Sequence, residues 1–409
     1  MTHLDLDFVR GQFPAFSEPS LEGFAHFENA GGSYACGQTI EWLGRYYRQT
    51  KVQPYYDFPA SRLAGQQMDN ARSRMAAWLN VGVDELHFGP STSQNSYVIA
   101  QALRQELKPG DEVIVTNQDH EANVGAWARL EDDGVVVKEW RVDRDTGELH
   151  IEGLEALLGE RTRAVAFTHC SNVVATINPV RKITDLIHEA GARAIVDGVS
   201  FAPHGMPDIA STGADIYFFS LYKVYGPHLG VMYLRNGLNA ELPHQGHFFN
   251  ADKPLARFTP AGPDHAQIAA VNGVMDYMEA VADRHGAGGE PAAARAETVR
   301  TLFRRHESLL LKPLLDFLSA HPRARLIGRR RAAVRAPTVS FTADGWGSCD
   351  LAARLAEFKL GVGVGHFYAY RLIEALGIDT DDGVVRTSFV HYTSEEEVTR
   401  LVKALDAVL

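Results

Sequence analysis

Short apolar runs alternate with longer amphipathic stretches over the first two thirds of the chain. Such runs, bounded by glycine, proline or polar clusters, are typical of buried strands, whereas residues 180–190 are expected to form a connecting helix. Strands that alternate with helices predict an α/β fold with a mostly parallel sheet and right-handed crossovers. The expected strands are residues 112–116, 135–142, 164–168 and 192–200, with a further strand within residues 214–231.

The pattern changes towards the C-terminus. Residues 284–293 give the clearest loop signal, and helical stretches beyond them alternate with strand-like residues 338–341 and 384–389. This arrangement predicts a small α+β domain. At the other end, residues 4–14 have helical spacing and stop at a proline. The expected units are an N-terminal segment (residues 1–24), a large domain (25–270) and a small C-terminal domain (271–409).

Composition narrows the class of protein. The chain has 409 residues, of which 45% are hydrophobic and 22% charged, so it is long enough for two globular domains that share a core. The net charge of −11 argues against a nucleic-acid-binding surface, and three scattered cysteines argue against a disulfide framework or a cysteine zinc site. The start lacks a signal peptide and no run reaches membrane-spanning length, so we expect a cytoplasmic protein without a membrane partner.

One lysine stands out chemically. Within residues 214–231, a strand of apolar residues leads directly into a turn that contains Lys223. Burial of an ammonium without a partner is costly and lowers its pKa, which suits an amine that forms a Schiff base with an aldehyde. The alternative is a turn lysine whose charged end reaches water.

A carboxylate supports the first interpretation. Asp197 lies near the end of the apolar run at residues 192–200, and open α/β sheets place their ligands beyond the carboxyl ends of their strands. A pyridoxal phosphate (PLP) site needs a lysine for the aldehyde and an acid that keeps the pyridine nitrogen protonated. Lys223 and Asp197 therefore form a candidate PLP site.

Three motifs resemble the class V aminotransferase family of PLP enzymes, and within it the cysteine desulfurase and selenocysteine lyase branch. These motifs are residues 169–180, 196–198 and 220–227, and the resemblance extends from about Phe27 to the C-terminus. It implies fold type I of PLP-dependent transferases, with a sheet of the seven-stranded type in the large domain. It also implies that the N-terminal segment packs on the small domain and that the protein is a homodimer.

The resemblance assigns roles to residues of the large domain. A hydroxyl-rich turn before a helix is usually an ordinary cap, but here it matches the phosphate loop of the family. The matching histidine of the family stacks on the pyridine ring, and the matching asparagine, otherwise an Asx-turn cap, bonds the ring hydroxyl. The implied catalytic residues are Lys223, Asp197 and His120, and the implied cofactor-binding residues are Thr92, Ser93, His120, Asn172, Asp197, Ser200, Ser220, Tyr222 and Lys223.

This chain departs from the family pattern at a few of these positions. Ser200 stands where glutamine is common, and Tyr222 stands where histidine is common. Pro263 replaces the threonine that usually reaches the phosphate of the partner subunit, so the cross-subunit donor is left open. We expect no metal, because His244 and His247 have no clustered third ligand.

The resemblance also suggests how an amino acid substrate is held. It places Asn29, Ala30 and Gly31 near the substrate carboxylate and assigns the binding of that carboxylate to Arg386. An arginine in an apolar strand needs an anionic partner, and its planar fork suits a carboxylate. A structural ion pair is the alternative for Arg386.

The reaction stays open at this stage. Desulfurases carry a nucleophilic cysteine in a mobile loop, but the matching stretch, residues 365–370, has Tyr368 at that position, and a tyrosine cannot carry a persulfide. Cys36 and Cys349 are interpreted as packing residues. The first hypothesis is an aminotransferase-like enzyme with Lys223 as general base, the second a cysteine or selenocysteine lyase, and the third a PLP-binding protein without turnover.

Overall fold

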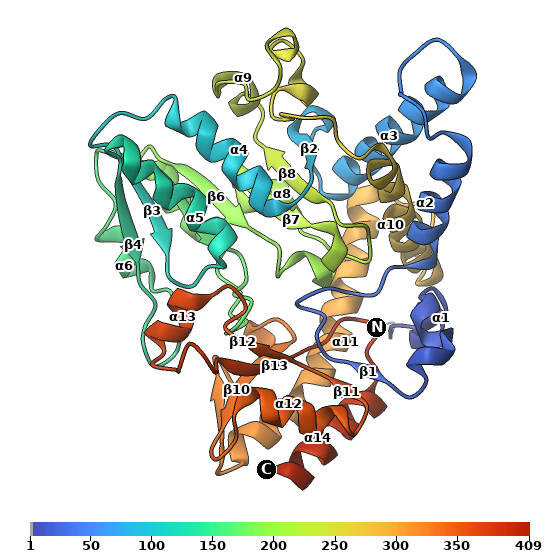
Figure 1. Ribbon diagram of the computed structural model, residues 1–409, viewed down its shortest axis with the longest axis vertical. Coiled ribbons are helices and arrows are strands. Elements are labelled where there is room, and N and C mark those ends of the chain that lie inside the picture. The colour runs from blue at the N-terminus through green and yellow to red at the C-terminus, as the bar shows by residue number, and fades with distance from the viewer. Residues whose placement is uncertain (1–2) are drawn as a thin grey trace.

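The computed structural model describes residues 3–409 and contains a large unit built on a seven-stranded sheet (Figure 1). Strand β8 is antiparallel to both of its neighbours, and all other neighbouring strands are parallel, which confirms the predicted sheet. The strand order is β2 (Leu86–Gly89), β8 (Gly230–Leu234), β7 (Ile216–Ser220), β6 (Arg193–Asp197), β5 (Thr162–Thr168), β3 (Glu112–Thr116) and β4 (Val136–Trp140).

Helices cover both faces of this sheet because both faces are apolar. In β3, Val113 and Val115 belong to one core cluster while Ile114 belongs to the other, as the alternation of side chains along a strand requires. The Val113 side packs against α4 (Thr92–Arg104) and α5 (Gly125–Ala128). The opposite side packs against α3 (Pro59–Trp78), α7 (Val180–Glu189) and α10 (His265–Arg284).

The smaller unit contains a four-stranded antiparallel sheet, below the large sheet in Figure 1. Its strands β10 (Thr338–Ala343) and β13 (Val384–Ser388) lie where the sequence predicted strands. The edge strands are β12 (Gly363–Gly365) and β9 (Ala324–Ile327). The helices α11 (Ala292–Ala320), α12 (Ser348–Ala356) and α14 (Glu395–Val408) share its core.

Helix α11 connects the two units, as the long helix in Figure 1 shows. Its N-terminal half contributes Val299 and Phe303 to the core of the large unit, and its C-terminal half contributes Leu310 and Leu314 to the core of the small unit. The predicted limit at residue 270 falls within α10, which packs along α2 (Gly37–Gln49) and α3 of the large unit.

The N-terminal segment lies where the two units meet. Helix α1 (Leu6–Gly11) carries Arg10, which pairs with Glu397 of α14 at 2.9 Å. The ring of Phe13 contacts Tyr225 of the large unit and Tyr392 beside the small sheet. Strand β1 (Ala25–His26) then pairs with β11 (Leu360–Gly361). The predicted substrate turn, residues 29–31, follows β1 and is thereby attached to the small unit.

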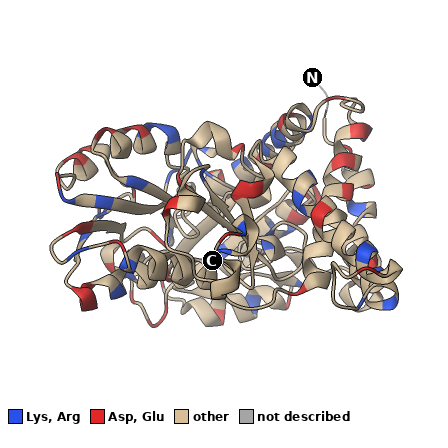
Figure 2. Ribbon diagram, turned by 90° about the horizontal axis from the view of Figure 1, so that it is seen from above, with Lys and Arg blue, Asp and Glu red and all other residues tan. Residues whose placement is uncertain are grey.

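Charged residues of both signs are interspersed over the helices and loops (Figure 2). Within residues 3–409, no helix is both long enough and apolar enough to cross a membrane. The cytoplasmic location stays a prediction.

Candidate active site

A cavity of about 270 Å³ opens where β5, β6 and β7 end and α4 begins. Loops at the carboxyl ends of parallel strands form the natural ligand site of such a sheet. Every residue that the sequence analysis assigned to cofactor binding lines this cavity, together with Ser91, Ala122, Thr168, Cys170, Val199 and His228. The fold therefore brings together side chains from six separate stretches of the chain.

One end of the cavity has the features of a phosphate site. Ser91 caps α4 by accepting a hydrogen bond from the Gln94 N–H at 3.2 Å, and the first N–H groups of the helix follow at Thr92 and Ser93. The Thr92 hydroxyl is 2.7 Å from the Ser220 hydroxyl, so two hydroxyl groups adjoin this helix start. A helix N-terminus with hydroxyl groups is suited to a phosphate dianion.

Lys223 lines the same cavity. Strand β7 ends at Ser220, and one 3-10 turn, Leu221–Lys223, brings the lysine in with 6% of its surface exposed. Within residues 3–409 its ammonium has no hydrogen bond or ion pair, although it lines the cavity. Burial lowers the pKa of Lys223 from 10.5 to about 8, and the positive charge of Arg386 adds to this effect. Asp197 opposes the shift.

Asp197 and His120 both line the cavity and are the residues expected to contact a pyridine ring. Asp197, the last residue of β6, accepts a hydrogen bond from the Val199 N–H at 2.8 Å, and burial raises its pKa, so its carboxylate would be stabilised by a cationic partner. His120 accepts a hydrogen bond from the Ala122 N–H at Nδ1, which places its proton on Nε2. Burial lowers the pKa of His120 to about 4, so its flat ring is neutral and suited to stacking.

Asn172 presents an acceptor that lacks a partner. Its Nδ2 donates to the Phe367 carbonyl at 2.9 Å, whereas its Oδ1 is buried and has no hydrogen bond within residues 3–409. Buried polar atoms are usually satisfied, so an unpaired acceptor in a cavity wall indicates a missing donor. A ring hydroxyl is such a donor. The cavity residues therefore fit PLP at its phosphate, its nitrogen, its hydroxyl and its aldehyde.

Arg386 lies in β13 beside this cavity and is 2% exposed. Its Nη1 donates to the Asn172 carbonyl at 3.1 Å, and its Nη2 pairs with the Glu28 carboxylate. The Phe367 ring covers the guanidinium, 3.6 Å from Cζ to the ring centroid. The sequence analysis gave a structural ion pair as the alternative role of Arg386. Such a pair is present, and the partner of Arg386 in it is Glu28.

The predicted substrate turn adjoins Arg386 but does not line the cavity. The Asn29 amide donates to the carbonyls of His26 and Ser388, both at 2.9 Å, and its oxygen accepts from the Tyr392 hydroxyl. The Ala30 N–H donates to the Ser388 hydroxyl at 2.8 Å. The Asn29 side chain is therefore used to attach the turn to β13. Gly31 donates its N–H to Glu28 at 2.6 Å.

Two residues at the site, Glu28 beside Arg386 and Cys170 in the cavity wall, were not identified from the sequence. Glu28 lies directly before the predicted substrate turn. This position was the only feature of the sequence that could have pointed to it. Cys170 lines the cavity from the loop after β5, but burial raises the pKa of its thiol to about 12, so the thiol stays protonated. Cys36 is buried and Cys349 is exposed at the start of α12.

Tyr368, which the sequence resemblance aligns with the desulfurase loop cysteine, is exposed. Its backbone has a left-handed φ of 57°, and its carbonyl accepts a hydrogen bond from the Glu121 N–H at 2.7 Å. Its ring lies 5.2 Å from the ring of His120, centroid to centroid. The loop therefore places a phenol, and no thiol, next to the predicted stacking histidine.

Solved structures share this architecture. A cysteine desulfurase from Thermococcus onnurineus NA1 has a TM-score of 0.86 at 23% identity, and the alignment covers 100% of this chain and 98% of that one. The cysteine desulfurase CsdA from Escherichia coli has a TM-score of 0.82 at 22% identity, covering 99% and 98%. The fold is thus fold type I of the PLP-dependent transferases, as predicted.

Sequence comparison defines the family. The family model for aminotransferase class-V matches residues 25–279 and 293–401, and the chain belongs to this family. An aminotransferase-like protein of Gibberella zeae is 36% identical, with 99% of this chain and 98% of that protein covered. A probable cysteine desulfurase of Pseudomonas aeruginosa is 32% identical, with 98% and 97% covered. The chain is therefore a member of a PLP-dependent enzyme family that acts on amino acids.

Proposed function

We propose that Lys223 binds PLP covalently and that the protein transforms an amino acid at its α-carbon, with transamination as the first candidate reaction. The buried and unpaired Lys223 amine, in one cavity with Asp197, carries this proposal. The bound cofactor would supply a pyridine ring that accepts the electron pair left on the α-carbon when a proton is removed.

The residues of the chain have distinct roles in this proposal. The Asp197 carboxylate would keep the ring nitrogen protonated, and the flat His120 ring would stack on the pyridine ring. Arg386 binds the substrate carboxylate and so orients the α-carbon. Once the amine of the substrate has displaced it from the cofactor, the Lys223 amine would be the general base that removes the α-proton and could return it at another carbon. The buried cavity excludes water from this transfer.

The cysteines argue against a protein-bound persulfide. Sulfur abstraction needs a thiolate, but Tyr368 replaces the loop cysteine, and the Cys170 thiol in the cavity is protonated. Cleavage of a C–S or C–Se bond without a persulfide is the second candidate, because similar proteins are named cysteine desulfurases. PLP binding without turnover is the third.

Product analysis separates these candidates. Purified protein is incubated with PLP and a panel of amino acids, including cysteine, while the visible spectrum is recorded. A keto acid together with pyridoxamine phosphate indicates transamination. Pyruvate with sulfide, or alanine with elemental sulfur that an added thiol reduces to sulfide, indicates a lyase. A visible band that no amino acid changes would contradict both reactions and support the non-catalytic alternative.

Glu28 is expected to compete with the substrate for Arg386. We predict that Glu28→Gln lowers KM about fivefold, which corresponds to about 1 kcal/mol, because a substrate carboxylate no longer displaces an anion from the buried guanidinium. Glutamine can still accept the Gly31 N–H, so the turn is preserved. Steady-state kinetics with the best substrate measures the change, and an unchanged KM would show that the carboxylate binds elsewhere.

The lowered pKa of Lys223 predicts a pH dependence for cofactor capture. Only the neutral amine attacks an aldehyde, so the rate at which cofactor-free protein takes up PLP is expected to rise with pH and level off above about 8. Stopped-flow absorbance measures this rate. A midpoint at the ordinary value of 10.5 would mean that the amine is not desolvated.

We also propose that the protein is a homodimer, as the sequence resemblance implies. The segment between α2 and α3 exposes Tyr55, Tyr56 and Phe58, a concentration of aromatic surface that supports an interface with a second copy. We expect dimers in sedimentation experiments and at least about tenfold weaker association for Tyr56→Glu. The control is Leu309→Glu, which changes an exposed leucine on α11. Equal association of both variants would exclude this surface.

A further inference from the structure

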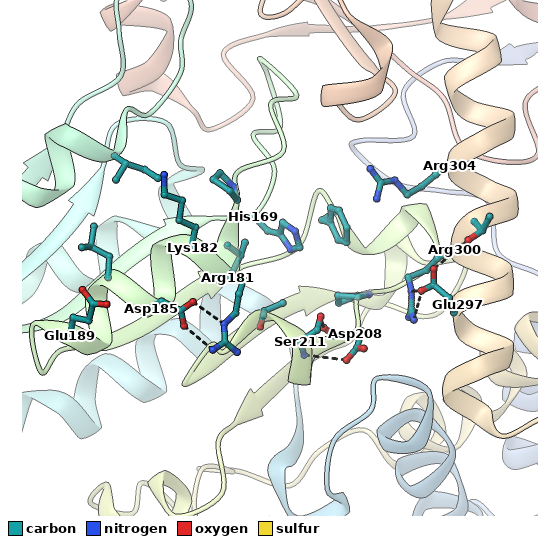
Figure 3. A pocket seen from close by; sticks show the side chains of 18 of the residues that line it. His169, Arg181, Lys182, Asp185, Glu189, Asp208, Ser211, Glu297, Arg300 and Arg304 are labelled. Atoms are coloured by element: carbon teal, nitrogen blue, oxygen red, sulfur yellow. Dashed lines mark hydrogen bonds and ion pairs between the residues drawn. The ribbon is translucent and has the colours of Figure 1, made fainter.

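A second cavity, of about 890 Å³, lies on the side of the sheet covered by α7 and α11 (Figure 3). Helix α8 (Ile209–Thr212) and both ends of α6 (Ile151–Glu155) complete its wall. It has no lining residue in common with the catalytic cavity. Its volume lies in the range of about 300–1,000 Å³ that is usual for small-molecule sites.

Two short backbone segments separate this second cavity from the catalytic one. Thr168 and Cys170 line the catalytic cavity, and His169 between them lines the second cavity. Likewise, Ser200 lines the catalytic cavity, whereas Phe201, the next residue, lines the second cavity. A ligand that moved His169 or Phe201 would therefore also move residues of the catalytic wall.

His169 offers a buried polar atom to the second cavity. Its ring stacks on Phe201 with centroids 3.7 Å apart, and its Nδ1 is 2.7 Å from the Tyr217 hydroxyl. Burial lowers the pKa of His169 to about 3 and raises the pKa of Tyr217 far above 10.0, so both groups are neutral. A phenol that donates to Nδ1 leaves the proton on Nε2, which then is a donor for the cavity.

Lys182 and Arg304 supply positive charge without an internal partner. In the part of the chain that the structure describes, residues 3–409, neither forms an ion pair or a side-chain hydrogen bond, and Figure 3 shows them on either side of His169. The other cations of the wall are neutralised by ion pairs, Arg181 with Asp185 at 2.8 Å and Arg300 with Glu297 at 3.0 Å.

Three acids of the wall, Glu155, Glu189 and Asp208, also have no ion pair within residues 3–409. The Asp208 carboxylate accepts hydrogen bonds from the Ser211 N–H and the Asn80 amide, both at 3.2 Å. Glu189 lies at the end of the cavity opposite Arg304 in Figure 3. An anionic group would therefore bind at the Arg304 end, where the cation and the His169 ring edge are available.

We propose that the second cavity binds a small metabolite through a carboxylate or phosphate group, held by Arg304 and the His169 Nε2–H, with Lys182 as a further cation. Such a ligand would join α7 of the large unit to α11, the helix that continues into the small unit. The site is independent of the proposed reaction, because its residues are not in the catalytic cavity.

Calorimetric titration of the full-length, PLP-saturated protein with inorganic phosphate and, separately, with succinate tests this proposal. Saturation with PLP fills the phosphate turn of α4, so added phosphate reports on other sites. We expect saturable binding of at least one probe and about tenfold or greater weakening in Arg304→Gln, since a charge-assisted hydrogen bond is lost. Binding of phosphate alone, or of succinate alone, identifies the group that is recognised.

The matched control is Arg305→Gln, the next residue of α11, which lines a different groove. It is expected to bind as the unsubstituted protein does. Absence of binding of both probes, or equal binding in Arg304→Gln, would overturn the proposal. Loss of succinate binding in Arg386→Lys but not in Arg304→Gln would place the ligand in the catalytic site and overturn it as well.

Discussion

Lys223→Ala is expected to reduce turnover by about 10³-fold or more, because the substitution removes both the nucleophile for the cofactor aldehyde and the general base. The visible absorption band of the Schiff base should be absent from the PLP-treated variant, which would show at most the absorption of the free aldehyde. Activity assays and spectra of the purified proteins measure both effects.

The fold of the Lys223→Ala variant should be intact. A buried ammonium without a partner is unfavourable, so Tm is expected to stay the same or to rise. Lys403→Ala, which changes an exposed lysine of α14, is the control and should retain full activity. Full activity of Lys223→Ala would contradict the assignment of the active site.

Arg386→Lys is expected to reduce kcat/KM about 100-fold, mainly through a higher KM. Lysine keeps the positive charge but loses the planar fork that binds a carboxylate with two hydrogen bonds. It also loses the flat surface that stacks under Phe367. Kinetics over a range of amino acid concentrations separate kcat from KM.

Arg325→Lys in β9 of the same sheet is the matched control and should leave both constants unchanged. Circular dichroism shows whether Arg386→Lys is folded. A folded Arg386→Lys variant with an unchanged KM would leave Arg386 with structural contacts only, namely those to Glu28, Asn172 and Phe367.

The alternation of strands and helices predicted the fold because local patterns determine it. The strands before Lys223 and Asp197 are continuous apolar runs, and both are buried in the sheet. Helix boundaries were harder to predict. The start of α3 at Pro59, for example, was not predicted, because few positions in the first half of this helix have a strong apolar pattern.

The cofactor residues were predictable because each follows a strand or begins a helix, and the sheet topology then brings these ends together. Contacts between residues far apart in the sequence were not predictable. Glu28 and Arg386 are 358 residues apart in sequence, and neither flanking sequence indicates the partner. Cys170 and His169 face different cavities. Their orientation depends on the conformation and packing of one loop, which the composition of the sequence does not indicate.

Borohydride reduction of the PLP-treated protein, followed by proteolysis and mass spectrometry, tests the central claim most directly. Reduction fixes the bond between the cofactor and its lysine, so the modified residue can be read from the peptide. We predict a single phosphopyridoxyl group on Lys223. Modification of a different lysine, or of none, would contradict the assignment of this cavity as a PLP site.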